Sequence, residues 1–283
     1  PPSVYVIKIK GVEIDRYEII PDQLLAMNPG TVNSPMTGIE VVEPAFGLPA
    51  IWINQAMRER AEMAGYTVVD PSTVIATHLT EVVRKNAHEI LGRQELQSLL
   101  DTVKAQYPLI VDEVIPKVVS HSLLLKVLQN LLREGVSIRN MVTILESLAD
   151  CGGMNEVDSL TEIVRQGLSR HICKTLTDES GVLNVISLDP RLEQLLTQSL
   201  QKVEGSVQLA LDPKVATDLL AKVKERIEEV MHEGRSPILL CSAMLRLSLK
   251  RLTERMAPRL TILSYNEIPT TVQLQSTGLI SLG

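Results

Sequence analysis

The sequence predicts a fold of mixed class, with α/β segments at both ends and a helical segment between them. The first 70 residues alternate apolar and polar side chains over short stretches, which is typical of strands. The middle third carries apolar residues at three- and four-residue spacing, which predicts packed helices. The last third returns to apolar, strand-like runs separated by amphipathic helices. The length of 283 residues suggests about two domains, and several small ones are also possible.

The composition is that of a globular protein, because 45% of the 283 residues are hydrophobic and 22% are charged. The net charge of −6 gives no reason to expect nucleic acid or an anionic membrane as partner. No apolar run approaches the ~18 residues of a membrane-spanning helix. Three widely spaced cysteines imply no disulfide framework, which fits a reducing compartment. The chain begins at Pro1 without an initiator Met, so we expect it to be part of a longer protein.

The N-terminal segments favour short strands. Val4 to Ile14 alternates well enough to predict one strand, interrupted at Gly11. Residues 28–37 contain the breakers Pro, Gly and Asn and predict a loop. Asn54 is placed to cap a short helix, which is followed by another strand at 66–69.

Three Asp-Pro pairs mark helix starts. Asp accepts hydrogen bonds from the first free amides of a helix, and Pro at the first position loses no bond that was available. The second and third pairs each follow an apolar stretch, so they predict strand-to-helix junctions. The pairs are Asp70-Pro71, Asp189-Pro190 and Asp212-Pro213.

The middle third predicts four helices without an intervening strand. Gly135 and Gly152 stand where C-terminal caps belong, and Asp158 stands where an N-terminal cap belongs. The predicted helices span Arg93–Gln106, Ser120–Glu134, Ser137–Asp150 and Ser159–Thr175.

The last third predicts two parallel strands, Pro237–Cys241 and Leu260–Ser264, joined by a crossover helix, Ala243–Met256. Arg246 and the cations that follow it form a basic face on this helix. We interpret this face as the solvated side of the helix rather than a patch for an acidic partner. Residues 270–283 are rich in Thr and Ser and predict a poorly tied tail.

No catalytic or cofactor motif is present in the sequence. It has no glycine-rich phosphate loop and no Gly-x-Ser-x-Gly nucleophile elbow. The five histidines make no metal-ligand spacing, so we expect no metal and no cofactor. An α/β enzyme that uses Cys241 as nucleophile is the alternative, but no neighbouring His or acid supports it, and a small buried thiol is the simpler interpretation.

The only Phe and the only Trp share one short segment, Glu43 to Trp52. Its two prolines and one glycine stiffen and bend the backbone. Phe46 is therefore expected in an exposed loop or at a strand edge, from which a ring can enter a partner's groove. The alternative is a core plug that closes a small subdomain, and the pattern leaves both open.

The helix predicted over Pro71 to Leu91 has an apolar side and one polar stripe. The stripe consists of Thr77, Glu81, Arg84 and His88 at three- and four-residue steps. Such a stripe usually marks the solvated face. Thr77 gains significance only if its end of the helix lies near the Phe46 loop.

A series of ordered sequence blocks runs through nearly the whole chain, from about Tyr5 to Pro269. They are LAMNPG (25–30), EPAFGLPAIWI (43–53), GYTVVD (65–70), THL (77–79), GRQE (92–95), KVLQNLL (126–132), SIRN (137–140), TILE (143–146) and LSYNEIP (263–269). In these blocks the chain resembles the cytoplasmic domain of the type III secretion export gate family, and of its flagellar branch in particular.

The resemblance implies four subdomains and a tail. The first is a small α/β subdomain, split and N-terminally truncated, and an α+β subdomain is inserted into it. A helical subdomain, through which family members assemble a ring, and a C-terminal α/β subdomain follow. The implied bounds are 1–21 with 71–90, then 22–70, 91–170 and 171–269, with the tail at 270–283.

The resemblance also implies a function that is not enzymatic. Family members form a docking platform of the flagellar protein export gate, which binds export chaperone–substrate complexes and passes substrates to the export channel. Further implied partners are the export switch protein, the ATPase complex and other copies of the chain in a ring. The implied location is the cytoplasmic side of a bacterial inner membrane, which is contacted only through an N-terminal half.

Six positions carry over from the chaperone-binding surface of the family: Met27, Glu43, Pro44, Phe46, Gly47 and Thr77. The acidic position is usually Asp and is Glu43 here, which keeps the charge and changes its reach. Two further interpretations stay open, namely the equivalent gate domain of a virulence-type secretion system and a purely structural ring subunit without cargo contact.

Overall fold

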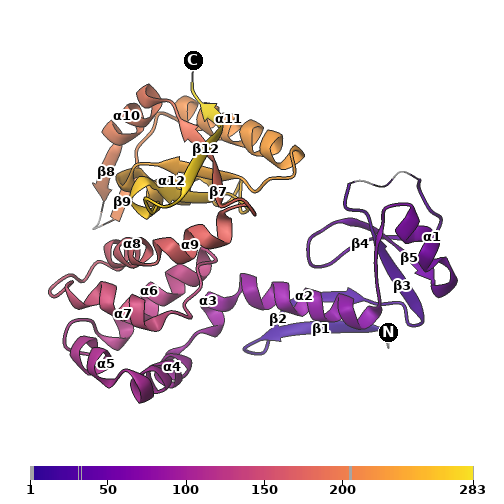
Figure 1. Ribbon diagram of the computed structural model, residues 1–283, viewed down its shortest axis with the longest axis horizontal. Helices are drawn as coiled ribbons and strands as arrows, with labels where there is room; N and C mark the ends of the chain where they lie inside the picture. The colour runs from indigo at the N-terminus through magenta and orange to yellow at the C-terminus, as the bar shows by residue number, and fades with distance from the viewer. Residues whose placement is uncertain (1–2, 31, 33, 204–205, 283) are drawn as a thin grey trace. The chain divides into compact units, whose positions relative to one another are not determined.

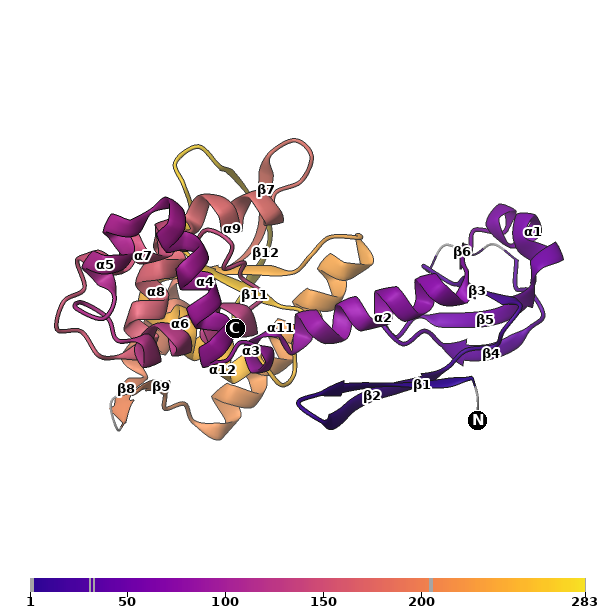
Figure 2. The ribbon, with the colours of Figure 1, turned by 90° about the horizontal axis from the view of Figure 1, so that it is seen from below.

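The computed structural model describes residues 3–30, 32, 34–203 and 206–282 (Figures 1 and 2). The chain divides into two compact units, Pro1–Gly92 and Arg93–Gly283. The prediction that the chain is part of a longer protein rests partly on Pro1, which lies outside the described residues. Two positions of the predicted 28–37 loop, 31 and 33, also lie outside them.

The first unit opens with an antiparallel hairpin of strands β1 (Val4–Ile9) and β2 (Val12–Glu18). Lys10 and Gly11 form its two-residue turn with φ of 49° and 84°. Positive φ at both positions is the geometry of the tight turns that match the twist of paired strands. The prediction of one strand interrupted at Gly11 was therefore wrong, because the chain reverses direction there.

A four-stranded antiparallel sheet follows, in the order β4-β5-β3-β6. Trp52 lies in the middle of β5, opposite Leu25 of β3 and Ile39 of β4, and is 1% exposed. Its strands are β3 (Gln23–Met27), β4 (Ile39–Val42), β5 (Pro49–Asn54) and β6 (Thr67–Val69).

A short helical segment, η1 (Gln55–Met57) and α1 (Arg58–Met63), joins β5 to β6 as predicted. Asn54 stands before it, but its side chain makes no capping hydrogen bond. Ala61 of α1 packs with the side chains on one face of the sheet.

Helix α2 (Pro71–Lys85) begins at the predicted Asp-Pro pair, where Asp70 Oδ1 accepts a 2.7 Å hydrogen bond from the amide of Thr73. The predicted helix does not continue to Leu91. It breaks at Asn86, whose side chain donates to the carbonyl of Val82, and a short α3 (Ala87–Ile90) follows. Asn competes in this way with helical hydrogen bonds.

The second unit begins with six helices. The helix predicted over Arg93–Gln106 is confirmed as α4. Ser120, the first residue of the next predicted helix, is the N-terminal cap of α6. The pattern missed the short α5, which begins at Pro108. The six are α4 (Arg93–Gln106), α5 (Pro108–Val114), α6 (His121–Arg133), α7 (Met141–Ala149), α8 (Val157–Gly167) and α9 (Ser169–Leu176).

The single helix predicted over Ser159–Thr175 is two helices, α8 and α9, which meet at Leu168. Asp158 lies inside the first turn of α8, and Glu156 occupies the cap position. The carboxylate of Asp158 instead pairs with Arg251 at 2.8 Å, so the predicted cap was wrong.

A four-stranded sheet, in the order β11-β10-β7-β12, completes the unit. Each strand runs parallel to its neighbours, and the predicted β10–β11 pair is confirmed. The strands are β7 (Val182–Leu188), β10 (Ile238–Cys241), β11 (Thr261–Ser264) and β12 (Gln273–Ile280). The other elements are α10 (Pro190–Gln198), the hairpin β8 (Leu200–Val203) and β9 (Ser206–Leu209), α11 (Pro213–His232), α12 (Ala243–Thr253) and the 3-10 turn η2 (Tyr265–Glu267).

The predicted tail was wrong for residues 273–280. They form β12, which pairs with β7 along its length and buries Ile280 to 2% exposure. Its Thr- and Ser-rich composition concealed the strand because β12 is an edge strand with many exposed residues.

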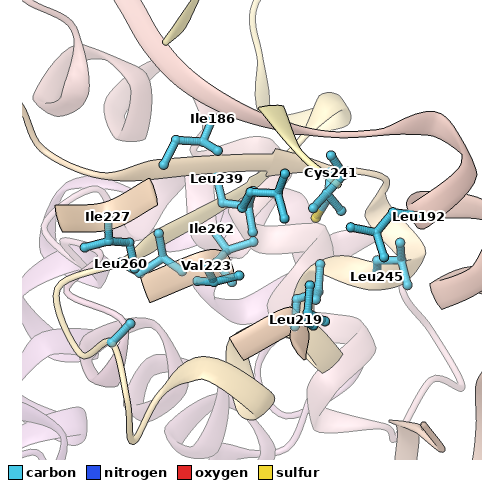
Figure 3. Close-up of a cluster of buried hydrophobic side chains, with 14 of the residues drawn as sticks. Ile186, Leu192, Leu219, Val223, Ile227, Leu239, Cys241, Leu245, Leu260 and Ile262 are labelled. Atoms are coloured by element: carbon cyan, nitrogen blue, oxygen red, sulfur yellow. The ribbon is translucent and has the colours of Figure 1, made fainter. Parts of the chain in front are cut away.

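One face of this sheet packs on helices α10, α11 and α12 (Figure 3). Ile186, Leu239 and Ile262 come from three adjacent strands, and Val223 and Leu245 come from the helices that cover them. All five side chains are at most 2% exposed. Burial of such side chains stabilises a fold by about 1.5–3 kcal/mol each.

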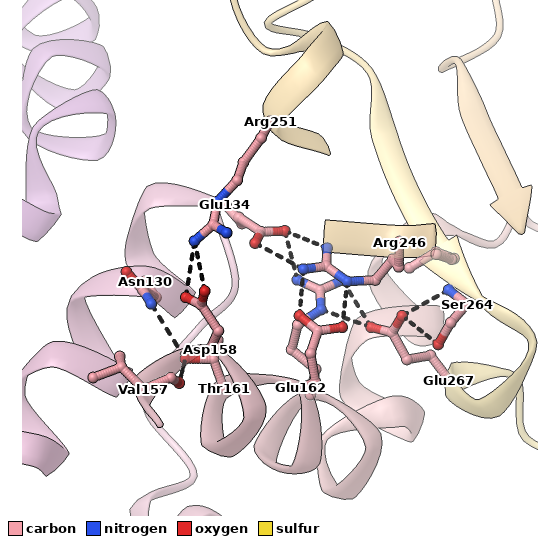
Figure 4. Close-up of polar contacts among 12 residues, drawn as sticks. Asn130, Glu134, Val157, Asp158, Thr161, Glu162, Arg246, Arg251, Ser264 and Glu267 are labelled. Carbon is pink, nitrogen blue, oxygen red and sulfur yellow. Dashed lines mark hydrogen bonds and ion pairs between the residues drawn. The ribbon is translucent and has the colours of Figure 1, made fainter. Parts of the chain in front are cut away.

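Buried ion pairs connect the helical part of the second unit to its α/β part (Figure 4). Arg246 of α12 is 0% exposed and lies 2.7 Å from Glu134, at the end of α6, and also pairs with Glu162 of α8. Arg165 of α8 bridges Glu134 at 3.0 Å and Glu267 of η2 at 2.7 Å. Our interpretation of Arg246 as part of a solvated face was therefore wrong.

The two guanidinium groups set the charge states of the carboxyls around them. Burial raises the pKa of Glu134, but Arg165 and Arg246 outweigh burial and leave that pKa below its ordinary value. At pH values above the pKa of a glutamate in the unfolded chain, the ionised Glu134 stabilises the fold. This stabilisation is lost as the pH falls through the lowered pKa of Glu134 in the folded protein. At Glu162 burial prevails over Arg246, and the pKa is raised.

Replacing Arg246 by Ala is expected to lower the free energy of unfolding by about 3–5 kcal/mol, because Glu162 loses its buried counter-charge and Glu134 loses one of its two. Urea unfolding followed by circular dichroism measures this change. Arg255→Ala, at an exposed position just past the same helix, is the control and should cost less than about 0.5 kcal/mol. Equal, small losses in both variants would contradict the structural role of the ion pairs.

Candidate functional site

A cavity of about 220 Å³ lies within the first unit, between the sheet, the segment after β4 and helix α2. Apolar side chains make up most of its wall. It is lined by Met27, Pro29, Glu43, Phe46, Leu48, Thr67, Val69, Val74 and Thr77. Four of the six residues carried over from the family surface thus line one cavity, and Pro44 and Gly47 lie in the loop beside it.

The loop that carries Phe46 is a tight turn between β4 and β5. Its backbone is closed by two hydrogen bonds, from the amide of Glu43 to the carbonyl of Leu48 at 2.9 Å and from the amide of Gly47 to the carbonyl of Glu43 at 3.0 Å. Gly47 has a φ of 71°, which a residue with a side chain rarely adopts. Lys85 of α2 contacts the carbonyl of Ala45 at 3.4 Å.

The carboxylate of Glu43 points back into this loop. One of its oxygens accepts from the amide of Ala45 and the other from the amide of Phe46, both at 2.7 Å. Glu43 is only 2% exposed, so the structure buries the acidic group that the family resemblance implies at the chaperone-binding surface.

The two aromatic residues of the segment have opposite environments. The ring of Phe46 is 47% exposed at the rim of the cavity, whereas Trp52 is 1% exposed. The core-plug interpretation therefore describes Trp52 and not Phe46. A half-exposed Phe beside an apolar cavity is typical of a surface that contacts a partner.

Met27 and Thr77 face Phe46 from two other elements. Met27 is the last residue of β3 and pairs with Ala50 of β5 and Thr67 of β6. Thr77 lies in the second turn of α2 and is half-buried. The part of α2 that carries Thr77 thus lines the same cavity as Phe46, which is the condition the sequence could not decide.

A buried polar cluster anchors α2 to the hairpin next to this site. His78 is 1% exposed and contacts Tyr5 Oη through Nδ1 at 2.8 Å and Asp15 through Nε2 at 3.1 Å. Burial, followed by the charges of Tyr17, Asp15 and Glu43, raises the pKa of Tyr5 to about 12. The Tyr5 hydroxyl thus stays protonated at neutral pH and can donate a hydrogen bond to Nδ1 of His78.

The sequence did not identify several residues of the cavity wall. Leu48, Val69 and Val74 belong to ordinary apolar patterns, and only the approach of the loop, β6 and α2 places them together. In the sequence they could have been found by proximity alone, because each lies within seven residues of a site residue or of the Asp-Pro pair that starts α2.

No group of three or more His, Cys, Asp or Glu side chains among the described residues is placed to hold a metal ion. Likewise, no described helix is both long and apolar enough to cross a membrane. Cys241, the candidate nucleophile, is 0% exposed, and burial raises its pKa strongly.

Alkylation of the native protein is expected to be slow at all three cysteines. Burial raises the pKa of each thiol, to about 11 at Cys173, which leaves little reactive thiolate at neutral pH. Mass spectrometry after iodoacetamide treatment should show Cys241 reacting on the order of a hundredfold more slowly than in urea-unfolded protein. Reaction of Cys241 well ahead of Cys151 and Cys173 would instead revive the enzyme hypothesis.

Comparison with known proteins places the chain in a family. The model of the FHIPEP family matches residues 1–273. The flagellar biosynthesis protein FlhA of Bacillus subtilis (strain 168) is 42% identical over 282 residues, which are 99% of this chain and 42% of that protein. FlhA of Escherichia coli (strain K12) is 42% identical over 280 residues, which are 99% of this chain and 40% of that protein. The chain thus spans about two fifths of the length of the curated relatives it matches.

Solved structures share the fold. The structure of the Chlamydia pneumoniae CdsV protein has a TM-score of 0.88 and 26% identity, and that of the CdsV and CdsO protein complex has a TM-score of 0.84 and 27% identity. Each match covers 99% of this chain and 81% of the solved chain. These findings confirm the resemblance drawn from the ordered sequence blocks, and the chain belongs to the FHIPEP family.

Proposed function

We propose that this chain is a docking domain of a flagellar type III protein export gate. It receives export chaperones with bound substrates at the cavity beside Phe46 and passes the substrates toward the export channel. The domain works on the cytoplasmic side of a bacterial inner membrane. The observation that carries the proposal is the convergence of Met27, Phe46 and Thr77, from three separate elements, on one apolar cavity.

The size and lining of the cavity support docking by an apolar side chain. A volume of about 220 Å³ has room for one large apolar side chain of a partner, and Phe46 at the rim would cover it. Full burial of such a group contributes about 1.5–3 kcal/mol. Met27 offers an adaptable wall, which suits a surface that receives several partners.

Exchange of cargo requires binding that can be released. One apolar contact of this size, with few polar groups around it, supports micromolar rather than nanomolar affinity, or about −8 kcal/mol. The weak binding suits a gate that hands each substrate on.

The flagellar interpretation is preferred over a virulence-type gate. Relatives that carry a flagellar name are 37–42% identical to this chain, whereas the CdsV protein is 26% identical. A second protein bound to a relative of the same fold, as in the complex of CdsV with CdsO, supports further contacts with export apparatus proteins such as the switch protein and the ATPase complex.

Phe46→Ala is expected to weaken binding of a flagellar chaperone–substrate complex at least on the order of tenfold, because the mutation removes the exposed ring at the cavity rim. Isothermal titration calorimetry with the wild-type chain measures the change. The control is Ile39→Ala, an apolar truncation of similar exposure on β4 that does not line the cavity.

Thermal melts of both variants separate docking from folding. We expect Phe46→Ala to melt within a few degrees of the wild type, because its ring is 47% exposed. Unchanged binding by Phe46→Ala would move the docking site elsewhere. A large fall in melting temperature with intact binding would show that the ring serves the core. If the wild-type chain does not bind the complex and Phe46→Ala changes only the folding stability, a purely structural ring subunit would be favoured.

We also propose that the helical region 91–170 mediates self-association into a ring. The corner between α4 and α5 supports this, because Tyr107 and Leu109 are 51% and 77% exposed there and Pro108 stiffens the turn.

Sedimentation velocity over a range of concentrations tests the ring proposal. The chain should be monomeric when dilute and associate at high concentration, and Leu109→Asp should suppress the association because it places a charge in the contact. Met63→Asp, at a residue that is 88% exposed in the first unit, is the control. Equal association of both variants would exclude this corner as the contact.

A further inference from the structure

We infer that Glu43 is a positioning residue, which orders the Phe46 loop for docking instead of contacting the docked partner. This inference rests on the proposed docking function. It differs from the role that the family resemblance implies, in which the acidic group belongs to the contact surface.

Both oxygens of the Glu43 carboxylate are engaged inside the loop. They accept from the amides of Ala45 and Phe46 at 2.7 Å each, and the residue is 2% exposed. Hydrogen bonds from amides to a charged carboxylate are short and roughly twice as strong as neutral ones. A partner that reached this carboxylate would have to displace one of them or insert behind Phe46.

The bond to the amide of Phe46 acts on the residue whose ring is exposed. The closing bonds between Glu43 and Leu48 and between Gly47 and Glu43 fix the two ends of the turn. The carboxylate of Glu43 holds the amides in the middle of the turn, at Ala45 and Phe46. The backbone of Phe46 is therefore held in one conformation, which orients its ring at the rim of the cavity. Ordering a loop before binding removes an entropic cost that the complex would otherwise bear.

Three substitutions of Glu43 differ in how many of the two loop hydrogen bonds they keep. Asp also accepts hydrogen bonds from amides two and three residues further along the chain. Glu43→Asp therefore keeps both hydrogen bonds with a side chain that is one methylene shorter. Gln has one acceptor oxygen, and its amide nitrogen would face a second donor, so Glu43→Gln keeps the size and loses one of the two bonds. Glu43→Ala loses both.

The first measurement needs no partner. Amide hydrogen exchange, followed residue by residue by NMR on the whole chain, should show the amides of Ala45 and Phe46 exchanging on the order of tenfold faster in Glu43→Gln than in the wild type. Glu43→Asp should restore most of the protection. Amides in the core strand β5 are the internal control for global stability. Unchanged exchange at Ala45 and Phe46 in Glu43→Gln would overturn the inference.

The second measurement is calorimetric titration of the same variants with a chaperone–substrate complex at several salt concentrations. A positioning residue predicts weaker binding by Glu43→Gln, by roughly tenfold, with the salt dependence of the wild type and with rescue by Glu43→Asp. A direct charge contact predicts a flatter salt dependence in Glu43→Gln, and that result would overturn the inference, as would wild-type affinity in a variant whose loop exchanges faster.

Failure of the two hypotheses gives different results. If the wild-type chain itself does not bind any chaperone–substrate complex, the proposed function is wrong, and with it the docking role of Glu43. If the wild type binds and Phe46→Ala does not, while Glu43→Gln binds as the wild type does, the proposed function stands and the inference about Glu43 falls.

Discussion

Two buried guanidinium groups, those of Arg165 and Arg246, hold the second unit in one arrangement. They lie between three carboxylates that come from the end of α6, from α8 and from η2, so the helical part and the α/β part share one set of ion pairs. A buried charge without its partner costs several kcal/mol, so these elements cannot separate or shift register cheaply. The parallel sheet and its covering helices are placed on the helical part by this constraint.

The first unit uses the same physical device on a smaller scale. The carboxylate of Glu43 is also buried, but its partners are two backbone amides of its own loop. In this loop Phe46 is half-exposed and Gly47 has no side chain, whereas Ala45 is buried. One charged group therefore stabilises an irregular turn and leaves the ring available at the rim of an apolar cavity. An ordered loop with an exposed ring is what a reusable docking surface requires.

The sequence predicted those features that depend on local chemistry. The Asp-Pro helix starts, the helix Arg93–Gln106 and the parallel β10–β11 pair follow from capping and periodicity. It failed where contacts distant in sequence decide the outcome. In the sequence Arg246 has the pattern of a solvated cation, and only the fold places Glu134 and Glu162 beside it. Likewise β12 has the composition of a tail, and only its pairing with β7 makes it a strand. The same holds for the site, where the family resemblance gave Met27, Phe46 and Thr77, but only the fold places them around one cavity and buries Glu43.

Methionine-methyl NMR tests the docking site most directly. The chain would carry labelled Met methyl groups, and an unlabelled chaperone–substrate complex would be added. Met27 lines the cavity, whereas Met63 and Met244 are 88% and 68% exposed at other places on the two units. The account predicts that the Met27 signal shifts or broadens on addition, while Met63 and Met244 do not change. Shifts at Met63 or Met244 with an unchanged Met27 would contradict docking at the Phe46 cavity.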